Sequence, residues 1–289
     1  MSDVYKLQYN GMTIAYPGWN GYVGYEEIEK IFHVIVNQPT GGIIIATPIE
    51  GPNGTVVVLT NAPLTDYKFI SYTVTGATLN NNQFTINGSD VTVTGTFQKT
   101  KEVWVNLGST EYSQTTSGTK SVTLTGMPSS SEFNYFTLVF DAYFFTTSSS
   151  AACDLFLRNS SNGTIWRARA HRSLNNYFGF VGITGNVTGW TTQSGQTVTS
   201  DNQDGVSYRC SNRWSNAWKR VKFVFDRNNK RCYFYISGTL LGYTTMNVDP
   251  IALKNIGVMK ETNGSSTQSV KNIRVAAFST LTDAQAYNG

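Results

Sequence analysis

The sequence is poor in the residue types that most enzymes and metalloproteins use. Only 14% of its 289 residues are charged, and it has two histidines and three cysteines. These numbers leave little material for a zinc site or a catalytic triad. The net charge of +4 arises without a lysine- or arginine-rich stripe, so nothing supports nucleic-acid binding. We therefore predict no metal, no cofactor and no nucleic-acid partner.

Long apolar runs and an export signal are also missing. No stretch approaches the roughly 18–20 apolar residues of a membrane-spanning helix, so no membrane partner is expected. The N-terminal sequence MSDVYKLQYNG lacks the apolar segment of a signal peptide. We expect a protein that stays in the cytoplasm or leaves the cell by a route other than ordinary secretion. The cysteines are odd in number and irregularly spaced, which predicts reduced thiols at Cys153, Cys210 and Cys232.

Strand-forming residues and turn signals are abundant. Period-two alternation, typical of half-buried strands, runs through Val91–Phe97, Phe136–Phe140 and Val221–Phe225. Asn-Gly pairs lie between the strand segments and favour tight turns. Helical periodicity is almost confined to two short segments, 25–31 and 281–287. Because these signals agree, we predict an all-β protein.

Composition divides the chain into three parts. Residues 1–30 are rich in tyrosine and glycine and are too few to fold alone. We expect Leu7–Ile14 to form a hairpin and the whole segment to dock on its own domain, a symmetry mate or a larger assembly. Residues 31–98 and residues 99–289 are predicted to be two separate β domains. The polar segment Gln98–Lys101 marks the boundary between them.

The middle part contains an ordered set of glycine, proline and aromatic positions. They are Gly41-Gly42, Ala46, Pro48, Gly54-Thr55-Val56, Pro63, Tyr67, Phe69 and the closing segment Asp90–Phe97. This order resembles the divergent internalin-B B-repeat family. The resemblance implies a small β-rich spacer or adhesion module without catalysis. Strand parity predicts that Tyr67 and Phe69 pack in one core with Phe84 and Phe97.

The C-terminal part carries a second pattern. Trp218 opens the segment WKRVKFVFD, and a hairpin with Ser237-Gly238 at its turn follows. The strand 271–278 then precedes a closing turn at 281–284. This pattern resembles the concanavalin A-like jelly roll of the laminin-G type, which implies two packed sheets and places Trp218 in the core. Its truncation to alanine should then destabilise the fold as loss of a core aromatic does.

Members of that superfamily include lectins, glucanases and interaction modules, so the fold alone does not give the function. The glucanases carry Glu-x-Asp-x-x-Glu, which aligns the carboxylates needed for glycoside hydrolysis. The motif is absent here, and we predict no catalytic residues. Asp201–Gly205 has the oxygen-rich spacing of a calcium loop but also fits a solvated turn. The cationic segment Arg167–Arg172 fits either a solvated sheet face or a surface for an acidic glycan or phosphate.

Tryptophans supply the candidate ligand-binding residues, because aromatic faces stack on the apolar side of sugar rings. Trp214 lies in a turn-rich segment between Asn212 and Asn216, whose amides can hydrogen-bond hydroxyls. Trp190 is a further candidate. We predict a ligand-binding site formed by these four residues, with a glycan as the possible ligand.

An adhesion-type module beside a lectin-like jelly roll is useful only outside the cell. Without an export signal, the pattern favours a virion protein, assembled in the host cytoplasm and released at lysis. The main hypothesis is a homo-oligomeric phage head fibre, decoration protein or short tail fibre. Residues 1–30 would bind other virion proteins, and the jelly roll would contact host or mucosal glycans. The alternative is a bacterial surface or secreted carbohydrate-binding adhesin. A glycoside hydrolase would need paired carboxylates, which we do not find.

Overall fold

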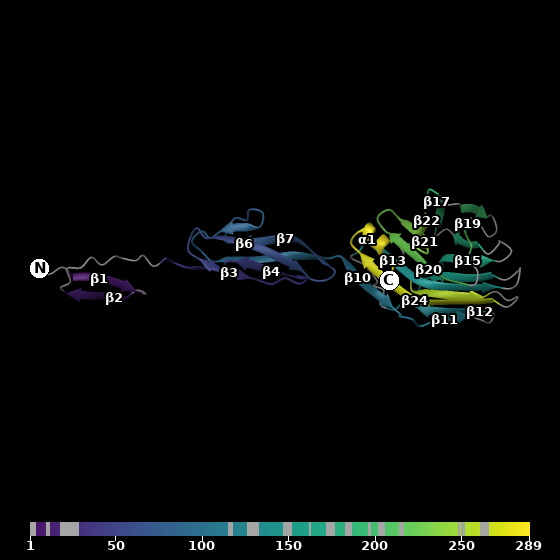
Figure 1. The fold of residues 1–289 in the computed structure, drawn as a ribbon, viewed down its shortest axis with the longest axis horizontal. Helices are drawn as coiled ribbons and strands as arrows, with labels where there is room; N and C mark the ends of the chain where they lie inside the picture. Colours follow the sequence, from purple (N-terminus) through teal and green to yellow (C-terminus); the bar gives the residue numbers. More distant parts are fainter. Residues whose placement is uncertain are drawn as a thin grey trace. The chain divides into compact units, whose positions relative to one another are not determined.

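In a computed structural model, the residues that the structure describes form β strands and one short helix (Figure 1). The all-β prediction is confirmed. The chain divides into a first unit, Met1–Ala62 with Ile70–Thr96, and a second unit, Pro63–Phe69 with Phe97–Gly289. The structure describes residues 4–9, 12–17, 29–114, 118–125, 133–146, 152–161, 163–171, 177–182, 187–195, 198–201, 206–213, 217–247, 249, 252–260 and 266–289.

The predicted N-terminal hairpin is present. Strands β1 (Val4–Tyr9) and β2 (Met12–Pro17) pair antiparallel, with Tyr9 opposite Met12. They form a two-stranded sheet of their own. The helical turns predicted over 25–31 are not seen at residues 29–31, and the rest of that segment lies outside the described residues.

The first unit contains two small sheets. One has the order β5-β3-β9-β7 and the other β4-β6-β8. Their bounds are β3 (Phe32–Val36), β4 (Gly42–Thr47), β5 (Glu50–Gly51), β6 (Val56–Pro63), β7 (Tyr67–Thr75), β8 (Gln83–Thr85) and β9 (Val91–Lys99). Alternate residues such as Ile44, Val57 and Val93 are buried between them. At Gly95 the sheets approach so closely that a Cβ would lie 2.8 Å from Ile44 Cδ1.

The expected core of Tyr67, Phe69, Phe84 and Phe97 is wrong in part. Phe84 is buried, whereas the other three are only half-buried. The rings of Phe69 and Phe97 do meet, with centroids 5.5 Å apart. For Tyr67 and Phe69 the physical reason is topological, because β7 is an edge strand and an edge strand is covered less completely than a central one.

The second unit is a two-sheet jelly roll, as the sequence predicted. Its eight-stranded sheet has the order β10-β24-β13-β20-β21-β22-β17, with β11 also pairing with β24. These strands are β10 (Lys101–Asn106), β11 (Tyr112–Gln114), β13 (Tyr135–Thr146), β17 (Val187–Thr192), β20 (Ala217–Asp226), β21 (Arg231–Ile236), β22 (Thr239–Met246) and β24 (Ser266–Phe278).

The seven-stranded sheet has the order β12-β23-β14-β15-β16-β19-β18. Its strands are β12 (Gly118–Thr123), β14 (Ala152–Arg158), β15 (Thr164–His171), β16 (Tyr177–Gly182), β18 (Val198–Asp201), β19 (Val206–Arg213) and β23 (Asn255–Lys260). Neighbouring strands in both sheets are antiparallel.

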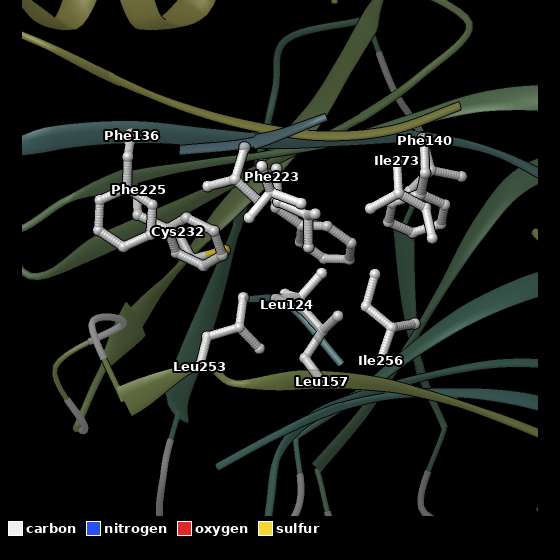
Figure 2. Packing of buried hydrophobic residues seen from close by; sticks show 14 of the residues in the cluster. Leu124, Phe136, Phe140, Leu157, Phe223, Phe225, Cys232, Leu253, Ile256 and Ile273 are labelled. Carbon is white, nitrogen blue, oxygen red and sulfur yellow. The ribbon is translucent and has the colours of Figure 1, made fainter. Parts of the chain in front are cut away.

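Phenylalanines of the eight-stranded sheet fill the space between the two layers (Figure 2). Phe136 and Phe225 pack with ring centroids 4.8 Å apart, and Phe223 packs on Phe234 at 5.0 Å. Leucine and isoleucine side chains face them from the opposite layer: Leu124, Leu157, Leu253 and Ile256. Cys232 lies free in this core, where burial raises the pKa of its thiol.

The predicted C-terminal helical segment forms α1 (Leu281–Ala286), with Thr280 as its N-cap. The helix lies on the outer face of the eight-stranded sheet and contacts β13, β20 and β24. Thr137 Oγ1 donates to the carbonyl of Ala284 at 2.6 Å, and Lys222 Nζ donates to that of Gln285 at 2.6 Å. The sheet thus satisfies last-turn carbonyls that have no partner within the helix.

The turn between β21 and β22 predicts a stabilising substitution. Ser237 and Gly238 both have positive φ, at 50° and 83°, and form a two-residue hairpin loop. Asparagine tolerates this conformation better than serine. Ser237→Asn should therefore raise the free energy of unfolding by roughly 0.5–1 kcal/mol. Thermal melts of the two proteins measure this, and Gly238→Ala should lower the melting temperature. A lower melting temperature for Ser237→Asn would contradict the turn assignment.

Candidate functional site

Strand parity determines which side chains reach the outer face of the eight-stranded sheet. In β20, Val221, Phe223 and Phe225 point into the core. The alternate residues Trp218 and Arg220 must therefore face outward. Trp218 is 37% exposed, so its predicted place in the core is wrong.

Two rows of outward residues cross neighbouring strands. In the first, Ser269 on β24, Tyr143 on β13 and Trp218 on β20 are direct partners in register. In the second, Lys271, Asp141 and Arg220 are aligned in the same way. Ser269 is buried, and the other five residues with one neighbouring amide form what we call the Trp218 patch: Trp218, Tyr143, Lys271, Asp141, Arg220 and Asn272.

The first row gives the patch its aromatic surface. The rings of Tyr143 and Trp218 have centroids 5.5 Å apart and are tilted by 40°. The ammonium of Lys271 lies 4.0 Å from the centroid of the Trp218 ring, which is cation–π geometry. The indole thus contacts both Tyr143 and Lys271, while more than a third of the Trp218 residue stays exposed to solvent.

The second row gives a fixed set of hydrogen-bonding groups. Asp141 accepts from Arg220 twice, at 2.5 Å from Nε to Oδ1 and at 3.3 Å from Nη2 to Oδ2. Asn272 Nδ2 donates to Asp141 Oδ2 at 2.6 Å. The other guanidinium nitrogen of Arg220 donates to the carbonyl of Asn288. These contacts restrain both charged groups, so the patch presents a preorganised polar surface.

A β-bulge positions the amide of Asn272. Val270 and Ile273 are both buried in the core, so β24 carries one more residue between them than strict alternation allows. The register with β13 shifts at this point, and Asn272 has a φ of 54°. Bulges redirect side chains in this way, and asparagine tolerates positive φ better than most residues.

The environment of Asp141 keeps it ionised. Burial raises the pKa of its carboxyl, but the hydrogen bonds from Arg220 and Asn272 and the nearby charges outweigh burial, and the net shift is downward. Asp141 is therefore a carboxylate at neutral pH. It accepts hydrogen bonds and has no proton to donate.

Residues 32–101 match the divergent InlB B-repeat domain. The match agrees with the resemblance seen in the sequence, and it covers the region of β3 through β9. No curated protein matches the chain. In the part of the chain that the structure describes, no helix has the length and apolarity to cross a membrane.

Three solved structures illustrate what the chain is similar to. The galectin LEC-6 of Caenorhabditis elegans is 12% identical, with 56% of this chain and 94% of the galectin covered and a TM-score of 0.36. The metal-free carbohydrate recognition domain of Emp46p is 9% identical, with 61% and 85% covered and a TM-score of 0.41. The alginate lyase AlyC3 is 10% identical, with 58% and 75% covered and a TM-score of 0.38.

The structure describes the backbone of two of the four predicted ligand-binding residues, and the predicted site stays a prediction. Trp214 and Asn216 lie outside the described residues. The backbone of Trp190 belongs to β17 in the eight-stranded sheet, and that of Asn212 belongs to β19 in the other sheet. The possible calcium loop also lies outside the described residues beyond Asp201.

Sequence reasoning missed the Trp218 patch, although one signal for it was present. The alternation of VKFVF assigns Val221, Phe223 and Phe225 to one face. Counting back by twos from Lys222 puts Arg220 and Trp218 on the opposite face. The family pattern suggested a core tryptophan instead, and the parity of the strand decides against it.

The Asp141 contacts predict a specific pH dependence. A carboxyl with a folded-state pKa below its unfolded value of about 3.9 adds stability above that value, and this contribution is lost as pH falls through the folded pKa. Asp141→Asn should therefore destabilise the protein at pH 7 and show a smaller loss of stability between neutral pH and pH 3. Denaturant unfolding at several pH values tests this, with Glu102→Gln, at a half-buried surface carboxylate of the same unit, as the control. Parallel profiles for wild type and Asp141→Asn would contradict the assignment.

Proposed function

We propose that the second unit binds glycans through the Trp218 patch and that the protein is a non-enzymatic display protein. The observation that carries the proposal is the exposed Trp218 ring, aligned in register beside a fixed row of charged and amide groups. Sugars offer a flat apolar face for stacking and hydroxyls for hydrogen bonding. On one sheet, the patch supplies an aromatic ring for the apolar face and charged and amide groups for the hydroxyls.

Preorganisation favours this use of the patch. Trp218 is held by Tyr143 and Lys271, and Asp141 is held by Arg220 and Asn272. Groups fixed before the ligand arrives lose little conformational entropy on binding. The turn-rich segment with Asn212, Trp214 and Asn216, and Trp190 on β17, remain proposed ligand contacts, as alternatives to the patch or as extensions of it.

The chemistry of the patch supports binding rather than hydrolysis. Glycoside hydrolases pair a protonated acid with a second carboxylate. Asp141 has a lowered pKa, and both of its oxygens accept hydrogen bonds. The Glu-x-Asp-x-x-Glu pattern is absent from the sequence.

We further propose that the protein is displayed on a phage particle as a head fibre, decoration protein or short tail fibre. The register of β1 and β2 aligns Tyr5, Leu7 and Tyr9 with apolar positions of the partner strand: Met12, Ile14 and Tyr16. A two-stranded sheet is at best marginally stable alone, so this apolar set supports docking on a larger assembly. Residues 32–101 would then act as a spacer. A bacterial surface or secreted adhesin is the alternative setting.

Alanine substitutions separate the two proposed ligand sites. Trp218→Ala should weaken glycan binding by about 1–3 kcal/mol. Because the ring is exposed, the same change should cost only about 1 kcal/mol of stability, the contribution of one aromatic pair. A glycan array and thermal melts compare it with Trp214→Ala and with Tyr243→Ala, an aromatic control on the same sheet face. Loss of binding in Trp214→Ala alone would move the site to the turn-rich segment.

Deleting residues 1–30 should leave the remaining chain folded but stop its incorporation into particles. One substitution on each face of the hairpin refines the test, because adjacent residues of a strand lie on opposite faces. Leu7→Asp should abolish incorporation, whereas Gln8→Asp should have little effect. The readout is the amount of protein that co-sediments with purified particles. Normal incorporation of the deletion variant would count against anchoring by this segment.

A further inference from the structure

We infer that the Trp218 patch selects sugars that carry a carboxylate and that Lys271 is the residue that determines this specificity. The inference rests on the proposed glycan-binding function and names the class of ligand. It follows from the position and the unpaired charge of one ammonium group. Besides its cation–π contact with Trp218, this ammonium has a charge that can meet a ligand.

The ammonium of Lys271 has no acidic partner in the described part of the chain. It lies 4.0 Å from the Trp218 ring centroid, and no carboxylate oxygen of a described residue comes within ion-pair distance. Asp141 is the partner of Lys271 in register, and the charge of Lys271 helps to lower the pKa of both Asp141 and Glu111. Both are bound elsewhere: Asp141 to Arg220 and Asn272, and Glu111 to the hydroxyl of Ser113.

The surrounding sheet face adds to the positive charge. Among the described residues of this face that are not buried, cations outnumber acidic groups, and the cations are Arg220, Arg231, Lys271 and Arg274. The acidic groups are Asp141 and the buried Asp226, with Glu111 beside β11. Asp226 and Lys222 are both buried, and they are hydrogen-bonded to Asn229 and to the last turn of α1, so neither charge is exposed to a ligand. A positive face raises the local concentration of anionic ligands.

The geometry places this charge where a sugar carboxylate would lie. Lys271 aligns with Asp141 in the second row, yet its ammonium reaches the Trp218 ring in the first row. A sugar that contacts Trp218 would bring its ring substituents within reach of this ammonium, which lies over the indole ring. A carboxylate there would meet the ammonium in a partly desolvated site, where an ion pair is stronger than in bulk water.

The test uses pairs of glycans that differ chiefly in the carboxylate. Oligogalacturonate is compared with its methyl ester, sialyllactose with lactose, and hyaluronan oligosaccharides with N-acetylglucosamine oligomers. Calorimetry or an array measures each pair on wild type, Lys271→Met, Lys271→Arg and Trp218→Ala. Lys254→Met, which removes one positive charge elsewhere in the second unit, is the matched control. Melting temperatures check that each variant is folded.

We expect at least one acidic glycan to bind wild type about tenfold more tightly than its neutral partner. Lys271→Met should remove this preference by weakening acidic binding far more than neutral binding, and Lys271→Arg should restore most of the preference. Added salt should weaken acidic binding in wild type more than in Lys271→Met. Equal binding of both members of every pair, or an unchanged preference in Lys271→Met, overturns the specificity and leaves the glycan-binding proposal intact. Absence of any binding that depends on Trp218 overturns both.

Discussion

The packing of phenylalanines between the two sheets of the second unit is the constraint on which the rest of the structure depends. A strand has only two faces, so burying Phe136 and Phe140 on β13 and Phe223 and Phe225 on β20 fixes the direction of every neighbour. Shifting either strand by one residue would put phenylalanine into water and charged residues into the core. The register that protects the core is therefore also the register that aligns the outward row ending at Trp218.

The outer face of the eight-stranded sheet is divided between two uses. Helix α1 covers one part, where Thr137 and the nearly buried Lys222 donate to its last-turn carbonyls. Burial lowers the pKa of Lys222, and two hydrogen bonds with a cation–π contact to Tyr235 offset the cost of burying its charge. Elsewhere on this face Trp218 stays partly exposed, which leaves its ring to solvent and to a ligand.

Much of the fold could be predicted because its signals are local. Period two in Val91–Phe97 and Val221–Phe225 marks segments that are strands in the structure, and the helical segment after residue 280 forms α1. The burial of Tyr67 and Phe69 was overestimated because nothing in their alternation shows that β7 is an edge strand. Local pattern tells which residues alternate but not which strands become neighbours.

The candidate site depends on such long-range neighbours. Asp141 meets Arg220 across 79 residues of sequence and Asn272 across 131. The amide of Asn272 reaches the carboxylate from a bulge that the alternation of KNIRVAAF does not reveal. Parity could have placed Trp218 on the outer face, but its partners Tyr143 and Lys271 become visible only once the strand order is known.

The central claim is that a glycan binds on the outer face at Trp218, and an NMR titration tests it most directly. The chain has six tryptophans, each with one indole N–H signal that can be assigned by substitution to phenylalanine. When a glycan that the protein binds is titrated in, the Trp218 signal should shift progressively and saturate. The signal of Trp104, which packs against the core, should stay in place. A fixed Trp218 signal, with saturating shifts at Trp214 or Trp190 instead, would contradict the account.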